Sequence, residues 1–325
     1  MPTATAIDLV LSPVSLGSAL PEGSFDLKVL GVHRAAFNLA LVGTGFVASI
    51  VGPSNAEEPM AIGLATEFDF RSWLPYKLGS GRLEGTTLDL LDARGIIRVR
   101  IIMGGAVRGA ATAIPPIGSN GEAWTIAVAE LARIQCRKSA ELRIDELQGP
   151  DGNVGVAHSP LTSAIRALAG APLPLAPPEA ILSRIVGSGP GLTPAGDDFL
   201  VGYAAASICA SGRERVIGPP TPPVELARAL SKAAESTTLL SASMLRLAAA
   251  GYFSGPLGLF AEALAENEPA RVVTALRRLC TIGHSSGADT ATGFLYGLGL
   301  LCGPSPGKHA ITPKSDKARR TQHAS

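Results

Sequence analysis

Gly187-Ser-Gly-Pro-Gly-Leu-Thr-Pro-Ala-Gly-Asp-Asp-Phe-Leu-Val-Gly202 combines a loop with the start of a helix. Five glycines and two prolines make its first half incompatible with a regular helix or strand. We expect Thr193 to be the N-cap and Pro194 the first helical residue, which places Asp197 and Asp198 in the first turn. The glycines let a ligand approach the backbone, and the free N–H groups of the new helix favour an anion, whereas two carboxylates repel one. A bridging cation, or an uncharged substrate, would resolve that conflict.

The same arrangement recurs ninety-one residues later. Gly196-x-Asp198-x-x-x-Gly202 is matched by Gly287-x-Asp289-x-x-x-Gly293, and both copies have hydroxyl residues just before the first glycine. These hydroxyl residues are Thr193 in one copy and Ser285 and Ser286 in the other. In each copy the aspartate and the later glycine are four residues apart and share a helix face. The repeat predicts two helix N-termini that face one site.

Composition limits the class of protein. The chain has 325 residues, enough for one large domain or two modest ones, with 46% hydrophobic and 17% charged residues. A net charge of +1 gives no reason to expect binding to nucleic acid or a membrane. The four cysteines are widely spaced with no C-x-x-C, which favours free thiols in a reducing compartment. We find no secretory signal and no apolar run of membrane-spanning length, and we expect a cytoplasmic protein.

The two halves of the sequence differ in pattern. Short apolar runs separated by Gly, Pro and Asn fill the first part, including Ala36–Val42 and Phe46–Val51, and Ile97–Ile101 alternates as a half-exposed strand does. Residues 116–303 have helical periodicity, and 304–325 are polar. We therefore predict an α+β fold with a β-rich domain over 1–115, as an antiparallel sheet or small barrel, packed on a helical domain over 116–303. A disordered tail would cover 304–325.

A cluster of hydroxyl residues interrupts the apolar helical pattern of 224–250. Thr237, Thr238 and Ser241 lie in this cluster. Hydroxyls compete with helical hydrogen bonds, so such a cluster kinks a helix or faces something polar. The alternative is that each hydroxyl bonds to a carbonyl of its own preceding turn.

The sequence spells out no standard nucleophile, P-loop or H-E-x-x-H zinc motif. His284, followed by Ser285 and Ser286, could act as a general acid or base or donate to an oxyanion. The alternative is an ordinary polar histidine near a helix cap. For Asp197 and Asp198 the alternative is compensation of the helix dipole. If they have a cofactor, it would be Mg²⁺, held by the two carboxylates and waters.

Together, three segments resemble a known bacterial family: 189–202, Thr238-Leu-Leu-Ser-Ala-Ser and Gly283-His-Ser-Ser-Gly-Ala-Asp. This is the AllH-like family, long described as a domain of unknown function, and His33 to Asn38 also match its N-terminal β region. One member is the AllH subunit of oxamate carbamoyltransferase, an enzyme of anaerobic allantoin breakdown. The resemblance implies a subunit that acts with two others to interconvert oxamate plus carbamoyl phosphate with oxalurate plus phosphate. It implies no catalytic residues. His33 stands between two predicted strands, where a histidine is more often structural, and a site role for it stays open because the resemblance includes this stretch.

The candidate site lies where the two predicted helix N-termini converge. We predict catalytic roles for Asp198, Asp289 and His284, with the aspartates accepting from an amide or binding a cation and the histidine transferring a proton. The predicted substrate-binding residues are Gly189, Gly191, Thr193, Gly196, Asp197, Thr237, Thr238, Ser241, Ser285, Ser286 and Gly287. The substrate would be a small anion or amide, and the partners other protein subunits. The alternatives are a non-catalytic scaffolding subunit, whose glycines only allow close helix packing, and a metal-dependent enzyme acting on a small amide or acid.

Overall fold

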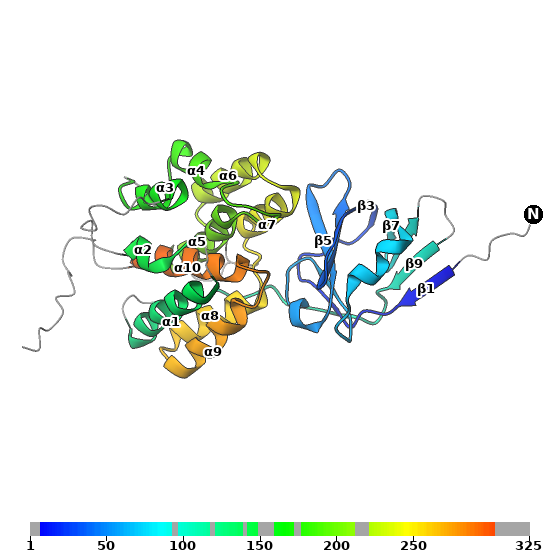
Figure 1. Cartoon of the computed structure of the whole chain (residues 1–325), viewed down its shortest axis with the longest axis horizontal. Coiled ribbons are helices and arrows are strands. Elements are labelled where there is room, and N and C mark those ends of the chain that lie inside the picture. Colours follow the sequence, from blue (N-terminus) through cyan, green and yellow to red (C-terminus); the bar gives the residue numbers. More distant parts are fainter. Residues whose placement is uncertain are drawn as a thin grey trace, which may run out of the picture.

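The computed structural model describes residues 7–92, 97–117, 121–138, 142–148, 159–171, 177–211 and 221–302. It has a β-rich N-terminal half and a helical C-terminal half (Figure 1), which confirms the α+β prediction. The domain boundaries at 115 and 303 stay predictions. The predicted tail over 304–325 lies outside the described residues.

One mixed sheet forms the N-terminal half. Its strands are β1 Ile7–Leu11, β2 Ser15–Leu16, β3 Ser24–Val32, β4 Ala36–Leu41, β5 Phe46–Val51, β6 Ala61–Gly63, β7 Leu78–Glu84, β8 Thr87–Asp92, β9 Ile97–Ile102 and β10 Val107–Arg108. Their order is β1-β9-β8-β7-β3-β4-β5-β6-β2-β10. Most neighbours are antiparallel, as predicted, but β1 pairs with β9, β5 with β6, and β2 with β10 in parallel. Two of these parallel pairs, β1 with β9 and β2 with β10, join segments that are distant in sequence, which local patterns do not reveal.

The sheet buries one face around an aromatic cluster. Phe37 of β4 lies 5.2 Å, centroid to centroid, from Trp73, and Phe70 lies 5.3 Å from the same ring. Trp73 and Phe70 belong to the 3₁₀ segment Phe70–Tyr76, and a shorter one covers Pro53–Asn55. Strand β8 alternates between half-buried and buried residues, because successive side chains of a strand point to opposite faces.

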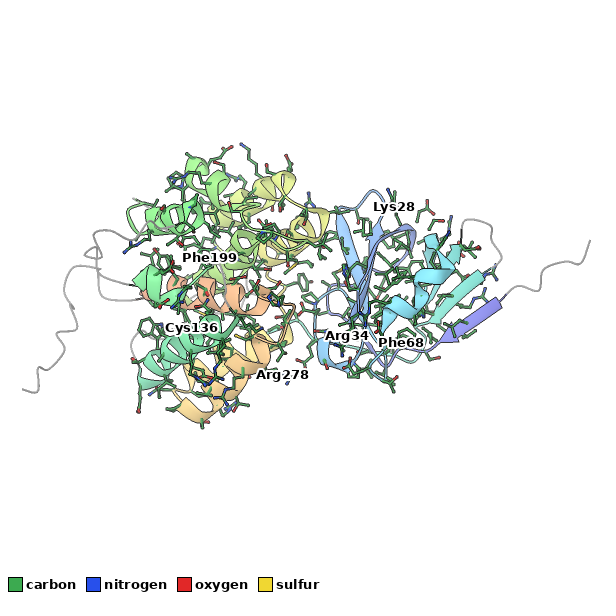
Figure 2. All side chains as sticks on the ribbon, viewed as in Figure 1. Lys28, Arg34, Phe68, Cys136, Phe199 and Arg278 are labelled. Carbon is green, nitrogen blue, oxygen red and sulfur yellow. The ribbon has the colours of Figure 1, made fainter. Side chains whose placement is uncertain are left out.

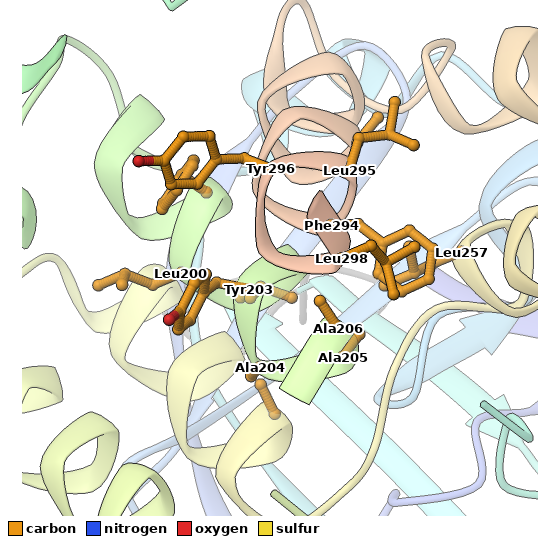
Figure 3. Packing of buried hydrophobic residues seen from close by; sticks show 14 of the residues in the cluster. Leu200, Tyr203, Ala204, Ala205, Ala206, Leu257, Phe294, Leu295, Tyr296 and Leu298 are labelled. Atoms are coloured by element: carbon orange, nitrogen blue, oxygen red, sulfur yellow. The ribbon is translucent and has the colours of Figure 1, made fainter. Parts of the chain in front are cut away.

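The C-terminal half consists of helices and one short 3₁₀ turn. Their bounds are α1 Glu122–Lys138, α2 Ile144–Gln148, α3 Pro160–Ala169, α4 Glu179–Ile185, α5 Ala195–Ser211, α6 Val224–Ala233, η3 Ala234–Ser236, α7 Leu239–Ala249, α8 Gly255–Ala265, α9 Pro269–Leu279 and α10 Ser286–Cys302. Helices α5 and α10 form the centre, and nearly every residue of α5 is buried. Figure 3 shows alanines of α5 in one cluster with Phe294, Tyr296 and Leu298 of α10. Small and large side chains therefore complement each other across this helix pair.

The predicted helix over 224–250 is wrong as a single element. It ends in the turn η3, and Thr237 has an extended backbone, with φ −133° and ψ −174°, before α7 begins. The Thr238 hydroxyl accepts a hydrogen bond from the Ser241 N–H at 3.2 Å and so caps α7. A threonine cap starts a new helix here because its side chain satisfies an N–H that has no intrahelical partner.

Helix α7 joins the two halves. Leu247, on this helix, packs into the hydrophobic core of the sheet, and α7 lies next to β5 (Figure 1). The Ser243 hydroxyl accepts from the Val47 N–H at 3.0 Å. Arg246 donates to the carbonyl of Gly45 at 3.0 Å. Arg278, labelled in Figure 2, adds an exposed ion pair with Glu57 at 2.7 Å.

Candidate functional site

The two repeated segments meet along α5 and α10. Gly202 lies so close to α10 that a Cβ atom would overlap the carbonyl oxygen of Thr290, and a Cβ at Gly293 would overlap that of Phe199. Residues 199 and 290, like 202 and 293, are ninety-one apart, so the two contacts are equivalent. The helices are therefore related by a local twofold arrangement, with their N-termini at the same end.

The first glycine of each copy also allows a close crossing. A Cβ at Gly196 would overlap the carbonyl oxygen of Ile185, the last residue of α4. In the same way, a Cβ at Gly287 would overlap that of Leu279, the last residue of α9. Both glycines thus permit helix packing, and this is a reason for their presence that requires no ligand.

Hydroxyl groups link the two N-termini directly. Thr193 Oγ1 and Ser286 Oγ are 2.8 Å apart and share a hydrogen bond. The predicted capping role of Thr193 is wrong, because α5 begins at Ala195 and the Thr193 hydroxyl accepts from no backbone N–H of this helix. Instead, the carbonyls of Pro194 and Ser285 accept the first helical hydrogen bonds, at 3.2 and 2.9 Å. Because the two helices converge, the Thr193 and Ser286 side chains point toward each other.

Asp198 lies beneath this hydroxyl pair. It is fully buried, and neither carboxylate oxygen has a hydrogen bond of good geometry within the described part of the chain. Burial raises the pKa of Asp198 well above its usual value, and the charges of Asp289 and then Asp197 raise it further. The nearby hydroxyls of Ser286 and Thr193 lower it only in part. Asp198 and Asp289, which is 1% exposed, therefore do not line an open cleft.

The carboxylate of Asp197 is held by hydrogen bonds from two other segments of the chain. One of its oxygens accepts from the Gly187 N–H at 2.8 Å, and the other from the Thr237 hydroxyl at 2.5 Å. It thereby ties the glycine loop and the start of α7 to α5. No group of three or more His, Cys, Asp or Glu side chains among the described residues is arranged to hold a metal. The donor set thus gives no support to the predicted Mg²⁺ site.

Three glycines of the glycine loop have positive φ. Gly187, Gly189 and Gly191 have φ values of 69°, 116° and 94°, which residues with a Cβ rarely adopt. Within the described residues, the N–H groups of Gly189, Gly191 and Leu192 form no backbone hydrogen bond, and all three residues are exposed. The loop therefore has backbone N–H groups that are not used in its own backbone hydrogen bonds.

The remaining predicted residues lie at the starts of α7 and α10. Thr238 donates to the Leu192 carbonyl at 2.5 Å, and Ser241 lies 3.5 Å from the same oxygen. His284 is exposed, and its imidazole has no hydrogen bond within the described chain. Ser285 is half-buried beside it. The hydroxyls thus hold the loop in place, and His284 lies at the entrance of α10.

Sequence reasoning missed Lys138, the last residue of α1. Its ammonium donates to the carbonyls of Cys280 at 2.7 Å and His284 at 2.8 Å, which fixes the loop before α10. No pattern in the sequence connects residue 138 to residue 284. A shallow pocket of about 380 Å³ lies elsewhere, with Arg228 and Arg246 in its lining, and includes none of the predicted residues.

A comparison with known families finds a similarity over part of the helical half. The model for the family described as oxamate carbamoyltransferase subunit AllH matches residues 185–298. This segment resembles the AllH family. The AllH match spans both repeated segments and the whole of α5, which confirms the resemblance seen in the sequence. No solved structure matches the chain. None of the described helices is both long and apolar enough to cross a membrane.

Proposed function

We propose that this AllH-like chain binds a small anion at the glycine loop, as a subunit of a complex resembling oxamate carbamoyltransferase. Candidate ligands are carbamoyl phosphate, oxamate and oxalurate. The observation that carries the proposal is the pair of hydroxyls, Thr193 and Ser286, above the buried Asp198. Polar groups converge there from two elements ninety-three residues apart, within the segment that matches the AllH family.

The chemistry of the surroundings suits an anionic oxygen. The exposed N–H groups of Gly189 and Gly191 are donors, and two helix N-termini point the positive ends of their dipoles at the same place. His284, exposed just before α10, would exchange a proton with the ligand. In this proposal Asp198 and Asp289 act from beneath the site, and Asp197 and Thr237 position the loop.

The family description names a subunit, so we propose that other protein chains complete the active complex. We place that complex in the cytoplasm, with neither nucleic acid nor a membrane as a partner.

A second candidate function is that of a non-catalytic scaffolding subunit. It is favoured by the packing of Gly196, Gly202, Gly287 and Gly293, each of which meets a backbone carbonyl of a neighbouring helix. In that case the repeated glycines would serve only the helix core, and the loop would bind no small molecule.

Isothermal titration distinguishes the anion-binding subunit from the scaffolding subunit. The purified chain is titrated with oxamate, carbamoyl phosphate and inorganic phosphate. We expect binding by the wild type and at least about tenfold weaker binding by Ser286→Ala, the effect of one lost hydrogen bond to a charged ligand. Thr274→Val is the matched control, since its exposed hydroxyl bonds only within α9, at 3.0 Å to Ala270. Absence of heat from the wild type with all three probes would favour the scaffold.

A further inference from the structure

A groove lies between α6 and α7, which pack side by side (Figure 1). Its volume of about 380 Å³ falls within the range of roughly 300 to 1,000 Å³ that small-molecule sites have in proteins. The groove lies toward the end of α7, whereas Thr238 holds the glycine loop at the start of that helix. This α6–α7 groove is therefore distinct from the candidate site predicted from the sequence.

Helical spacing explains how the groove forms. The residues of α6 in its lining are three or four apart and so share one face; they are Val224, Ala227, Arg228 and Ser231. Leu226 and Leu230 lie on the opposite face of α6 and are buried in the helical core. From α7 the lining includes Arg246, Ala249 and the C-cap residue Ala250. The alanines are too small to fill the space between the helices, which leaves the groove open.

The charge in the groove is positive. Within the described residues, its lining contains Arg228 and Arg246 and no acidic residue. Arg246 is half-buried and donates to the Gly45 carbonyl at 3.0 Å, which uses one of its five N–H donors and fixes the guanidinium group. Arg228 is exposed, and neither arginine has an acidic partner in the described part of the chain. Guanidinium groups are the donors that best match carboxylates and phosphates.

We propose that the α6–α7 groove binds a small organic anion, with Arg228 and Arg246 holding its anionic oxygens and the apolar lining holding its carbon skeleton. The ligand class is a phosphate or carboxylate that carries an alkyl or aromatic group. Ser231 supplies no donor, because its hydroxyl already donates to the Ala227 carbonyl at 2.9 Å. The inference goes beyond the proposed function, since the groove and the glycine loop share no residue.

Isothermal titration of the purified chain with phenyl phosphate, benzoate and inorganic phosphate tests the groove. We expect at least one of the two aromatic anions to bind, and to bind at least about tenfold more tightly than inorganic phosphate, because the apolar lining removes the ring from water. Absence of binding by both aromatic anions would overturn the inference, as would equal affinity for inorganic phosphate.

Variants of the lining locate the binding. Arg228→Gln should weaken it at least about tenfold, the effect of losing a hydrogen bond to a charged ligand. Ala250→Leu, at an exposed position, fills the groove without changing the charge and should weaken binding as strongly. Lys232→Gln is the matched control, because it removes a positive charge of α6 that lies outside the lining and pairs with Glu179 at 2.8 Å. Equal weakening by Arg228→Gln and Lys232→Gln would show general attraction to positive charge and no specific site.

The Ser286→Ala variant separates the groove from the glycine loop. If it loses phenyl phosphate while Arg228→Gln, folded by circular dichroism, retains it, the ligand binds at the loop and the groove inference is wrong. If Arg228→Gln loses the aromatic anion while the wild type gives no heat with oxamate or carbamoyl phosphate, the groove inference stands and the proposed function fails.

Discussion

Adjacent aspartates in the first turn of α5 have opposite environments. Asp197 accepts hydrogen bonds from Gly187 and Thr237, whereas Asp198 points into the contact with α10 and has no hydrogen bond of good geometry within the described chain. Residues one apart on a helix project about 100° away from each other. One carboxylate therefore fastens the loop, and the other enters the interior of the helix pair.

We predict that Asp197→Ala is strongly destabilising. The substitution leaves the Gly187 N–H and the Thr237 hydroxyl without their acceptor, so the free energy of unfolding should fall by about 3 kcal/mol. Thr237→Val removes only one of the two hydrogen bonds and should cost about 1 kcal/mol. Urea unfolding measures both variants, and an equal effect of the two would show that Asp197 does not anchor the loop.

Glu58 should make stability depend on pH. Burial, and then the charge of Glu57, raises its pKa from 4.5 to about 7. The folded chain therefore binds more protons than the unfolded chain between these values, and this contribution to stability is full below about pH 4.5 and lost as pH rises through about 7. Glu58→Gln should remove that decline in urea unfolding. Glu225→Gln, exposed on α6, should keep it; an unchanged pH profile in Glu58→Gln would contradict the prediction.

The contact between α5 and α10 depends on residues that lack a side chain. The aspartate, the glycine four residues later and a small residue four further on lie along one face, and the last of these are Ala206 and Gly297. A Cβ at Gly297 would already crowd the Ala206 methyl group. This spacing brings the backbones together over two turns and so carries the hydroxyl pair into hydrogen-bonding distance.

Substitution of Gly202 tests that contact. Gly202→Ala should destabilise the protein by at least about 3 kcal/mol, because its methyl group meets the backbone of α10 and the helices must separate. Gly299→Ala, on the exposed side of α10 with only ordinary contact to Trp124, should instead stabilise by up to about 1 kcal/mol. Thermal unfolding measures the stability of both variants, and similar changes in stability would argue against a close contact between α5 and α10.

At the scale of the whole molecule, α7 connects the candidate site to the sheet. Its N-terminal residues hold the glycine loop through Thr238 and the Leu192 carbonyl. Further along, Ser243 binds β5 and Leu247 enters the core of the sheet. The loop and the sheet are thus attached to a single rigid element.

We predict that Leu247→Ala loosens both halves together. Removing a buried leucine should lower the free energy of unfolding by about 3 kcal/mol. Hydrogen exchange should become faster in β4 and β5 as well as in α7. Leu239→Ala, on the same helix but 40% exposed, should cost less than about 0.5 kcal/mol. Faster exchange confined to α7 would show that the halves are not coupled.

The sequence by itself determined those features that depend on neighbouring residues. Glycine and proline marked the loop at 187–194, apolar periodicity separated a β-rich half from a helical half, and the spacing shared by Asp198 and Asp289 indicated paired helix starts. The segments that resemble the AllH family were also visible in the sequence, and the match over 185–298 confirmed them. All of these signals are local, because backbone preference and helical spacing act within a few residues.

Only the tertiary structure decided which groups meet. It buried Asp198, turned Thr193 toward Ser286, broke the helix at Thr237 and placed Leu247 in the other half of the molecule. Each of these outcomes depends on a partner distant in sequence. The free energy of a carboxyl or hydroxyl group depends on whether water or protein surrounds it, and that choice is made when distant elements pack.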